Sequence, residues 1–81
     1  MTVYHATTPA KLARYEATGC ILSPVRFWLN ERCARAWAER VGRTVIVAFE
    51  RPDAAYPLPD HKPRGMAWWT PDHVRAWRVS A

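Results

Sequence analysis

The spacing of apolar side chains predicts a helix over Glu31–Val41. Apolar residues recur there at i, i+1, i+4, i+5 and i+8, opposite charged residues, which is the pattern of a helix with one buried face. Asn30 precedes the pattern as an N-cap, and Gly42 follows it as a residue that readily adopts the left-handed conformation at a helix end. The apolar positions are Cys33, Ala34, Trp37, Ala38 and Val41.

Cap residues predict an earlier helix, Pro9–Thr18. Thr8 is a natural N-cap, a proline occupies the first helical position, and Gly19 can end the helix. Leu12 and Tyr15 fall on one face of this helix, so we expect that face to pack on the core. The cations of the helix are expected to face water: Lys11 and Arg14.

Strands are predicted before, between and after the two helices. The strongest signal is 43–50, where β-branched residues are dense and apolar side chains alternate between two faces. One face carries Val45, Val47 and Phe49, and the other carries Ile46 and Ala48. Further strands are expected at 3–6, 26–29, 66–70 and 74–79.

Proline positions predict the connections in the second half of the chain. Residues 51–64 contain four prolines and are expected to form a loop without a regular element. Thr70 followed by Pro71 resembles a cap with a proline at the first helical position, so a single helical turn is expected at 70–73. The order of elements predicts one α+β domain, 1–81, in which two helices pack on a small, mainly antiparallel sheet.

Composition limits the class of protein. The 81 residues allow one hydrophobic core, and no apolar run approaches the roughly 20 residues that cross a bilayer. The first residues lack the features of a signal peptide, so we expect a cytoplasmic protein with no membrane partner. The formal net charge of +5, with ten arginines among twelve cations, favours an anionic partner, although GC-rich coding produces a similar composition.

Several kinds of chemistry have no motif in this chain. Cys20 and Cys33 do not form a CxxC pair and have no clustered histidines, so we expect no metal and read both as buried thiols. There is also no GxGxxG or P-loop pattern.

Three short motifs in order resemble the N-terminal half of the ADP-ribosyltransferase-like fold. Residues 4–7 read Tyr-His-Ala-Thr, residues 19–24 read Gly-Cys-Ile-Leu-Ser-Pro, and residues 27–30 read Phe-Trp-Leu-Asn before an alanine-rich helix. In that family a first strand ends in a Tyr-His-Gly-Thr type motif, followed by a helix, an Ile-Leu turn and a second short strand. The likeness covers most of the chain through short, degenerate motifs.

The resemblance implies that the chain binds NAD or a related nucleotide. It implies that His5 hydrogen-bonds the ribose and amide region, that Thr7 supports it, and that Phe27 or Trp28 stacks near the nicotinamide. With Arg26 as the adjacent cation, the candidate NAD-binding residues are His5, Thr7, Arg26 and Trp28. From its own chemistry, a neutral imidazole at a strand end suits either a ribose hydroxyl or a backbone carbonyl, and both roles stay open for His5.

The sequence departs from the family at two points. Catalytic members carry a glutamate on a late strand, where it stabilises positive charge as nicotinamide leaves, but 66–70 and 74–79 contain no carboxylate. Ala6 also replaces the glycine after the histidine, which narrows the backbone approach for a dinucleotide. The sequence therefore leaves open whether the protein is an enzyme.

The alternative function is a non-enzymatic basic module that binds a protein or nucleic acid. Trp68 and Trp69 are adjacent in a predicted strand, so they point to opposite faces, and the more exposed ring would mark the binding surface. Arg64 and His61 are the neighbouring polar residues for such a surface. A homodimer is also left open, because a small sheet leaves strand edges to protect.

Overall fold

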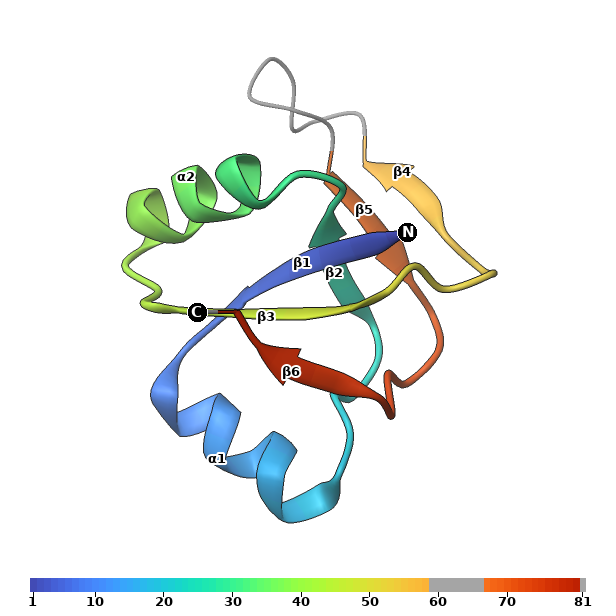
Figure 1. Cartoon of the computed structure of the whole chain (residues 1–81), viewed down its shortest axis with the longest axis horizontal. Helices are drawn as coiled ribbons and strands as arrows, with labels where there is room; N and C mark the ends of the chain where they lie inside the picture. The colour runs from blue at the N-terminus through green and yellow to red at the C-terminus, as the bar shows by residue number, and fades with distance from the viewer. Residues whose placement is uncertain (59–66, 81) are drawn as a thin grey trace.

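A computed structural model describes residues 1–58 and 67–80 as an α+β domain (Figure 1). Within these residues, two helices pack on one antiparallel sheet with strand order β4-β5-β2-β1-β3-β6, as the sequence predicts. The elements are β1 (Thr2–Thr7), α1 (Pro9–Thr18), β2 (Val25–Trp28), α2 (Glu31–Val41), β3 (Val45–Glu50), β4 (Tyr56–Leu58), β5 (Ala67–Thr70) and β6 (Trp77–Val79).

The cap residues define both helices as predicted. Thr8 accepts a hydrogen bond from the Lys11 amide, and Gly19 ends α1 with φ at 79°. Asn30 caps α2, and Gly42 ends it with φ at 75°. Both glycines therefore occupy the left-handed region, which costs a side-chain-bearing residue free energy. Neither helix is long and apolar enough to cross a membrane, a finding restricted to the residues that the structure describes.

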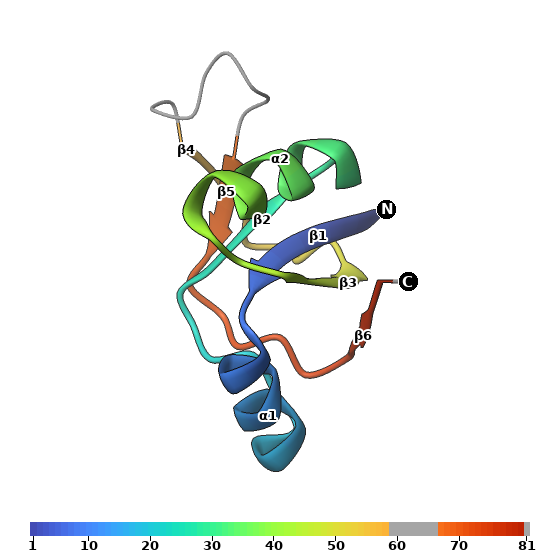
Figure 2. The ribbon, with the colours of Figure 1, turned by 90° about the vertical axis from the view of Figure 1, so that its left-hand side faces the viewer.

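The sheet consists of two halves that diverge at β1 and β2. β1 and β3 pair along their whole length, from Thr2↔Glu50 to Thr7↔Val45. In contrast, the pairing of β1 with β2 consists of one register position, Tyr4↔Trp28. Figures 1 and 2 show the result, since β1 and β3 run across the direction of β2 and β5. The two strands thus separate beyond Tyr4, toward the end of β1 that leads into α1.

Two apolar clusters stabilise the domain. The first contains the buried Phe27 and Phe49 and extends to Tyr15 of α1. The second lies under α2, where Ala34 and Ala38 pack near Trp28 and Ile46. Alternating residues of β3 belong to different clusters, which agrees with the predicted alternation of faces. Val41, expected on the buried face of α2, is instead 43% exposed because it lies at the end of the helix.

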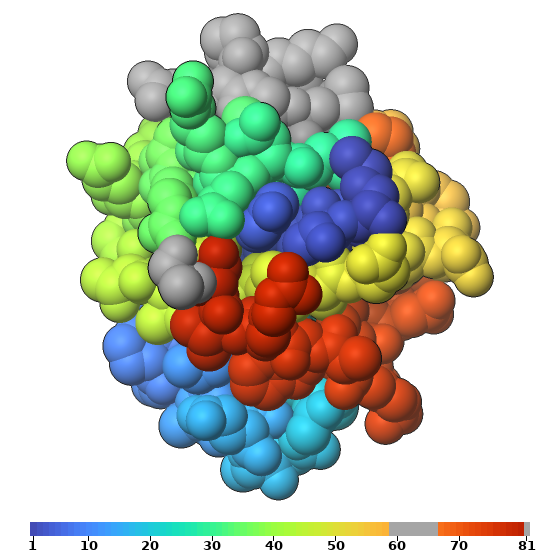
Figure 3. All heavy atoms as spheres, viewed as in Figure 1, coloured from blue at the N-terminus to red at the C-terminus, as the bar shows by residue number. Residues whose placement is uncertain are grey.

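The C-terminal strand closes the first cluster from one side. β6 pairs with β3 and lies between β3 and α1 (Figures 1 and 3). The Trp77 ring makes an edge contact with the Tyr15 ring, at 6.0 Å between centroids. α1 is therefore held by contacts from both ends of the chain.

Two predictions for the second half of the chain are wrong. The 51–64 segment was expected to lack regular structure, but β4 forms at Tyr56–Leu58 and pairs Pro57 with Trp68. A proline is tolerated there because β4 is the edge strand, where one row of amide donors is not needed.

The helical turn expected at 70–73 is also absent from the described residues. The Thr70 hydroxyl accepts a hydrogen bond from the Asp72 amide, which forms a turn in place of a helix. Val74 then exchanges backbone hydrogen bonds with Ile21, at 2.7 and 3.0 Å. This long-range bridge holds the segment extended, and regular pairing resumes in β6.

Candidate functional site

His5 joins β1 to β2 at the point where these strands separate. Its Nδ1 lies 2.6 Å from the carbonyl oxygen of Arg26, and its Nε2 lies 3.2 Å from the Tyr15 hydroxyl. The Thr7 hydroxyl lies 3.1 Å from the same Tyr15 oxygen. β1 therefore reaches the Arg26 carbonyl through a side chain, beyond the one backbone pairing position of these strands.

The carbonyl fixes the direction of this hydrogen-bond chain. A carbonyl only accepts, so Nδ1 of His5 donates to Arg26 and Nε2 is left as the acceptor of a neutral imidazole. Tyr15 then donates to Nε2, and Thr7 donates to the Tyr15 oxygen. Both ring nitrogens of His5 are thus engaged within the protein.

The electrostatic surroundings keep His5 neutral. Its side chain is buried, and this burial is the main reason that the pKa of His5 is lowered from 6.5 to about 4. The hydrogen bond to the Arg26 carbonyl opposes the change, whereas the positive charges of Arg43, Lys11 and Arg26 add to it. At pH 7 the imidazole is therefore uncharged, as the hydrogen-bond pattern requires.

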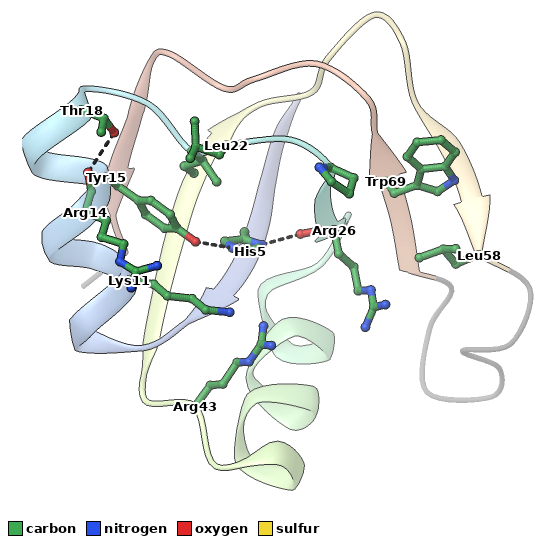
Figure 4. A pocket seen from close by; sticks show the side chains of 12 residues that line it. His5, Lys11, Arg14, Tyr15, Thr18, Leu22, Arg26, Arg43, Leu58 and Trp69 are labelled. Carbon is green, nitrogen blue, oxygen red and sulfur yellow. Dashed lines mark hydrogen bonds between the residues drawn. The ribbon is translucent and has the colours of Figure 1, made fainter.

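A pocket of about 460 Å³ opens beside His5 (Figure 4). α1 forms one wall, β2 and β5 form the opposite side, and Arg43 approaches from the segment between α2 and β3. The described residues that line it are His5, Lys11, Arg14, Tyr15, Thr18, Ile21, Leu22, Pro24, Arg26, Arg43, Leu58 and Trp69.

The pocket is strongly basic. Four of the described lining residues are cations, and no described lining residue is a carboxylate. Arg43 is held in place by a 2.9 Å hydrogen bond from Nη1 to the Ala6 carbonyl. The Arg26 guanidinium lies 5.5 Å from the centroid of the Trp37 ring, a cation–π contact. Two of the four cations are thus positioned by the fold, whereas Lys11 and Arg14 reach in from the exposed face of α1.

Trp69 gives the pocket an aromatic boundary. β5 places it beside Arg26, its partner in the β2–β5 register. Its ring contacts the Tyr56 ring at 5.3 Å between centroids, and Leu58 lines the pocket from the same edge of the sheet. The pocket therefore combines cations from α1, β2 and the segment before β3 with an apolar, aromatic surface that lies next to Arg26.

The structure brings together two of the four predicted binding residues. His5 and Arg26 both line the pocket, and they are joined by the Nδ1 hydrogen bond. Thr7 is fully buried behind Tyr15, and Trp28 is 3% exposed under α2, where its ring packs on Trp37 at 5.8 Å. Thr7 and Trp28 thus support the site from the core and do not line the pocket.

Two residues of the alternative site, Trp68 and Trp69, lie within the described part of the chain. Trp68 and Trp69 point to opposite faces as expected, and Trp68 packs on the first cluster with Arg51 5.1 Å from its ring centroid. Trp69 is the ring that borders a pocket. Arg64 and His61 lie outside the described residues.

Several lining residues are not among the binding residues predicted from the sequence. Lys11 and Arg14 are exposed, as predicted, but they face the pocket together with Tyr15. The spacing of Lys11, Arg14 and Tyr15 indicates that they share a face of α1, because residues three and four apart lie on the same side of a helix. Arg43 had no such signal, since only the three-dimensional fold brings it near His5.

The described part of the chain was compared with the requirements of a metal site, and its two cysteines are both unbridged. No group of three or more histidine, cysteine, aspartate or glutamate side chains there is arranged to hold a metal ion. Cys20 is buried, and Cys33 is half-buried on α2. Both thiols are free.

Comparisons with protein-family models, with curated proteins and with solved structures gave no match for this chain. The similarity of residues 4–7, 19–24 and 27–30 to the ADP-ribosyltransferase-like fold therefore stays a prediction from the sequence.

Proposed function

We propose that this chain binds a nucleotide of the NAD class in the pocket beside His5. The observation that carries the proposal is the charge of the pocket, in which four cations and no carboxylate are found among the described lining residues. Like charges gathered in one concave site attract an anion strongly, because the low-dielectric walls focus their field. A ligand with adjacent phosphates supplies the compensating charge.

The types of side chain support a phosphate ligand. Three of the four cations are arginines, whose planar guanidinium groups bind phosphate oxygens in a bidentate manner. The volume of about 460 Å³ also agrees with small-molecule sites, which typically measure about 300–1,000 Å³. A diphosphate would lie among the cations, leaving the rest of the nucleotide to reach the sheet edge.

Trp69 and Leu58 support the nucleoside part of the proposal. An indole ring offers a flat, apolar face on which a base can stack. Because Trp69 lines the same pocket as the cations, one ligand can contact both. A free inorganic anion would contact only the cations.

His5 acts in this proposal as a positioning residue. Both of its nitrogens are hydrogen-bonded to Arg26 and Tyr15, so it holds α1 and β2 at the distance that forms the pocket. This differs from the direct contact with the ribose that the family resemblance implies. The resemblance itself supports the proposal, since it implies the same ligand class and shares His5 and Arg26 with the pocket.

Calorimetric titration of the full chain with NAD⁺, ADP-ribose, AMP and pyrophosphate tests the proposal. We expect NAD⁺ and ADP-ribose to bind at least roughly tenfold more tightly than AMP or pyrophosphate, because their shared adenosine diphosphate ribose portion can contact both the cations and Trp69. Arg26→Gln should weaken binding about tenfold or more through loss of a charged contact. Arg32→Gln, on the exposed face of α2, is the matched control and should leave binding unchanged.

Two results would contradict the proposal. One is the absence of binding by every nucleotide at millimolar concentration. The other is salt-sensitive binding of an oligonucleotide that Arg32→Gln weakens as much as Arg26→Gln does, because this would indicate a diffuse basic surface that contacts many phosphates. That second result would favour the alternative module for nucleic acid.

A further inference from the structure

Among the residues that the structure describes, the pocket beside His5 offers hydrogen-bond donors and positive charge but no anionic group. Lys11, Arg14, Arg26 and Arg43 all line it, and the described lining residues include no carboxylate. His5 is neutral and hydrogen-bonded through both ring nitrogens. A positively charged part of a ligand would therefore meet repulsion with no compensating ion pair.

The neutral polar groups of the pocket do not offset its positive charge, because their hydrogen-bonding atoms are already used within the protein. The Tyr15 oxygen already accepts from Thr7 while its proton is donated to His5. The Thr18 hydroxyl is 2.8 Å from the Arg14 carbonyl and 3.1 Å from the Cys20 carbonyl, so its donor is used within the backbone of its own turn. Among the described lining residues, the π faces of Tyr15 and Trp69 can attract a cation, and the Trp69 ring is also in contact with Tyr56.

Members of the NAD class differ in a way that this pocket can detect. NAD⁺, NADH and ADP-ribose share the adenosine diphosphate ribose portion. The nicotinamide ring is cationic in NAD⁺, is neutral in NADH, and is missing from ADP-ribose. The four cations attract the shared diphosphate equally in all three ligands. A difference in affinity among the ligands therefore measures the contribution of the nicotinamide ring.

We infer that the pocket selects the ADP-ribose portion of a ligand and discriminates against a cationic nicotinamide ring. This inference rests on the proposed function. ADP-ribose and NADH are the preferred ligands of the pocket, and NAD⁺ binds more weakly. The physical reason is that each lining cation attracts the diphosphate but repels the charged nicotinamide. The protein is thus a binder of ADP-ribose-type compounds, including the product left when nicotinamide departs.

Calorimetric titration of the full chain with the three ligands tests this inference. We expect ADP-ribose and NADH to bind about tenfold more tightly than NAD⁺ at low ionic strength. The difference between NADH and NAD⁺ should shrink as salt is added, because salt screens interactions between partly exposed charges. Equal or tighter binding of NAD⁺ would overturn the inference while leaving the proposed function intact, whereas no binding of any of the three would overturn both.

A charge reversal within the pocket provides an independent readout. Arg14→Glu introduces a carboxylate into the lining, so it should weaken ADP-ribose and reduce the NADH preference over NAD⁺ by about threefold or more. Arg32→Glu changes the net charge of the protein by the same amount outside the pocket. If both variants changed the NADH to NAD⁺ ratio equally, the preference would arise from overall charge, and the pocket-based inference would fail. Circular dichroism spectra identical to that of the parent would establish that both helices remain folded.

Discussion

At the scale of single residues, His5 shows how one side chain serves the fold and the pocket together. A neutral imidazole has one donor and one acceptor, and here the donor meets the Arg26 carbonyl while the acceptor meets the Tyr15 hydroxyl. The two roles considered from the sequence were a ribose contact and a backbone contact. The hydrogen bond to Arg26 corresponds to the second role, and a bound ribose would have to displace Tyr15 to restore the first.

The lowered pKa of His5 predicts that acid destabilises the protein. The imidazole has a pKa of 6.5 in the unfolded chain and about 4 in the folded one, so between these values the unfolded state binds more protons. The contribution to the free energy of unfolding is complete above pH 6.5 and is lost as pH falls toward 4. The full contribution is roughly 3 kcal/mol, because a pKa lowered by one corresponds to about 1.4 kcal/mol.

Urea denaturation at pH 7, 6 and 5 measures this effect. The protein should lose stability over this range, and His5→Gln should start less stable and lose markedly less. A parallel decline in both proteins would show that other groups cause the acid sensitivity. Stopping at pH 5 keeps most carboxylates ionised, which separates the histidine from them.

At the scale of elements, caps and strand composition made most of the fold predictable. Thr8 with Gly19, and Asn30 with Gly42, delimit α1 and α2 at the predicted residues because capping is a local hydrogen-bonding property. The wrong predictions concern segments whose structure depends on distant partners. β4 exists because β5 lies beside it, and Val74 is extended because Ile21 bonds to it.

Gly19 can be used to test whether the end of α1 is set by the local backbone conformation. Its φ of 79° disfavours a side-chain-bearing residue, yet no atom lies within 4 Å of the position that a Cβ would occupy. Gly19→Ala should therefore lower the free energy of unfolding by about 1–2 kcal/mol through backbone strain alone. Gly19→Asn should cost less, because asparagine tolerates the left-handed region better. Equal losses for the two variants in urea denaturation would point to a steric cause.

At the scale of the whole molecule, the pocket arises from the separation of β1 and β2. The four cations among its described lining residues come from three places in the fold, α1, β2 and the segment between α2 and β3, and no sequence motif joins them. His5 and Arg26 could be selected from the sequence, but the divergence of β1 and β2 after Tyr4↔Trp28 could not, because it depends on the three-dimensional fold. The packing of the Trp28 ring in the apolar cluster under α2 depends on the fold in the same way.

The proximity of the four cations should also lower the free energy of unfolding of the ligand-free protein. Their mutual repulsion is present in the folded state and is largely relieved on unfolding. Lys11 is the cation to test, because its side chain is exposed while its charge lowers the pKa of His5, which shows that it acts on the site electrostatically. Lys11→Gln should raise the free energy of unfolding without ligand by roughly 0.5 kcal/mol, the size typical of exposed charge pairs.

The same substitution should weaken nucleotide binding several-fold, so stability and affinity should change in opposite directions. Urea denaturation and calorimetric titration on one protein preparation provide both measurements. Arg32→Gln, which removes an exposed cation that does not line the pocket, should change affinity little. Loss of stability together with loss of affinity in Lys11→Gln would mean that Lys11 supports the fold, and the basic cluster would then be a product of packing with no role in holding an anion. Opposite signs are expected only if the cluster is maintained against its own repulsion, which is the behaviour of a site shaped for a ligand.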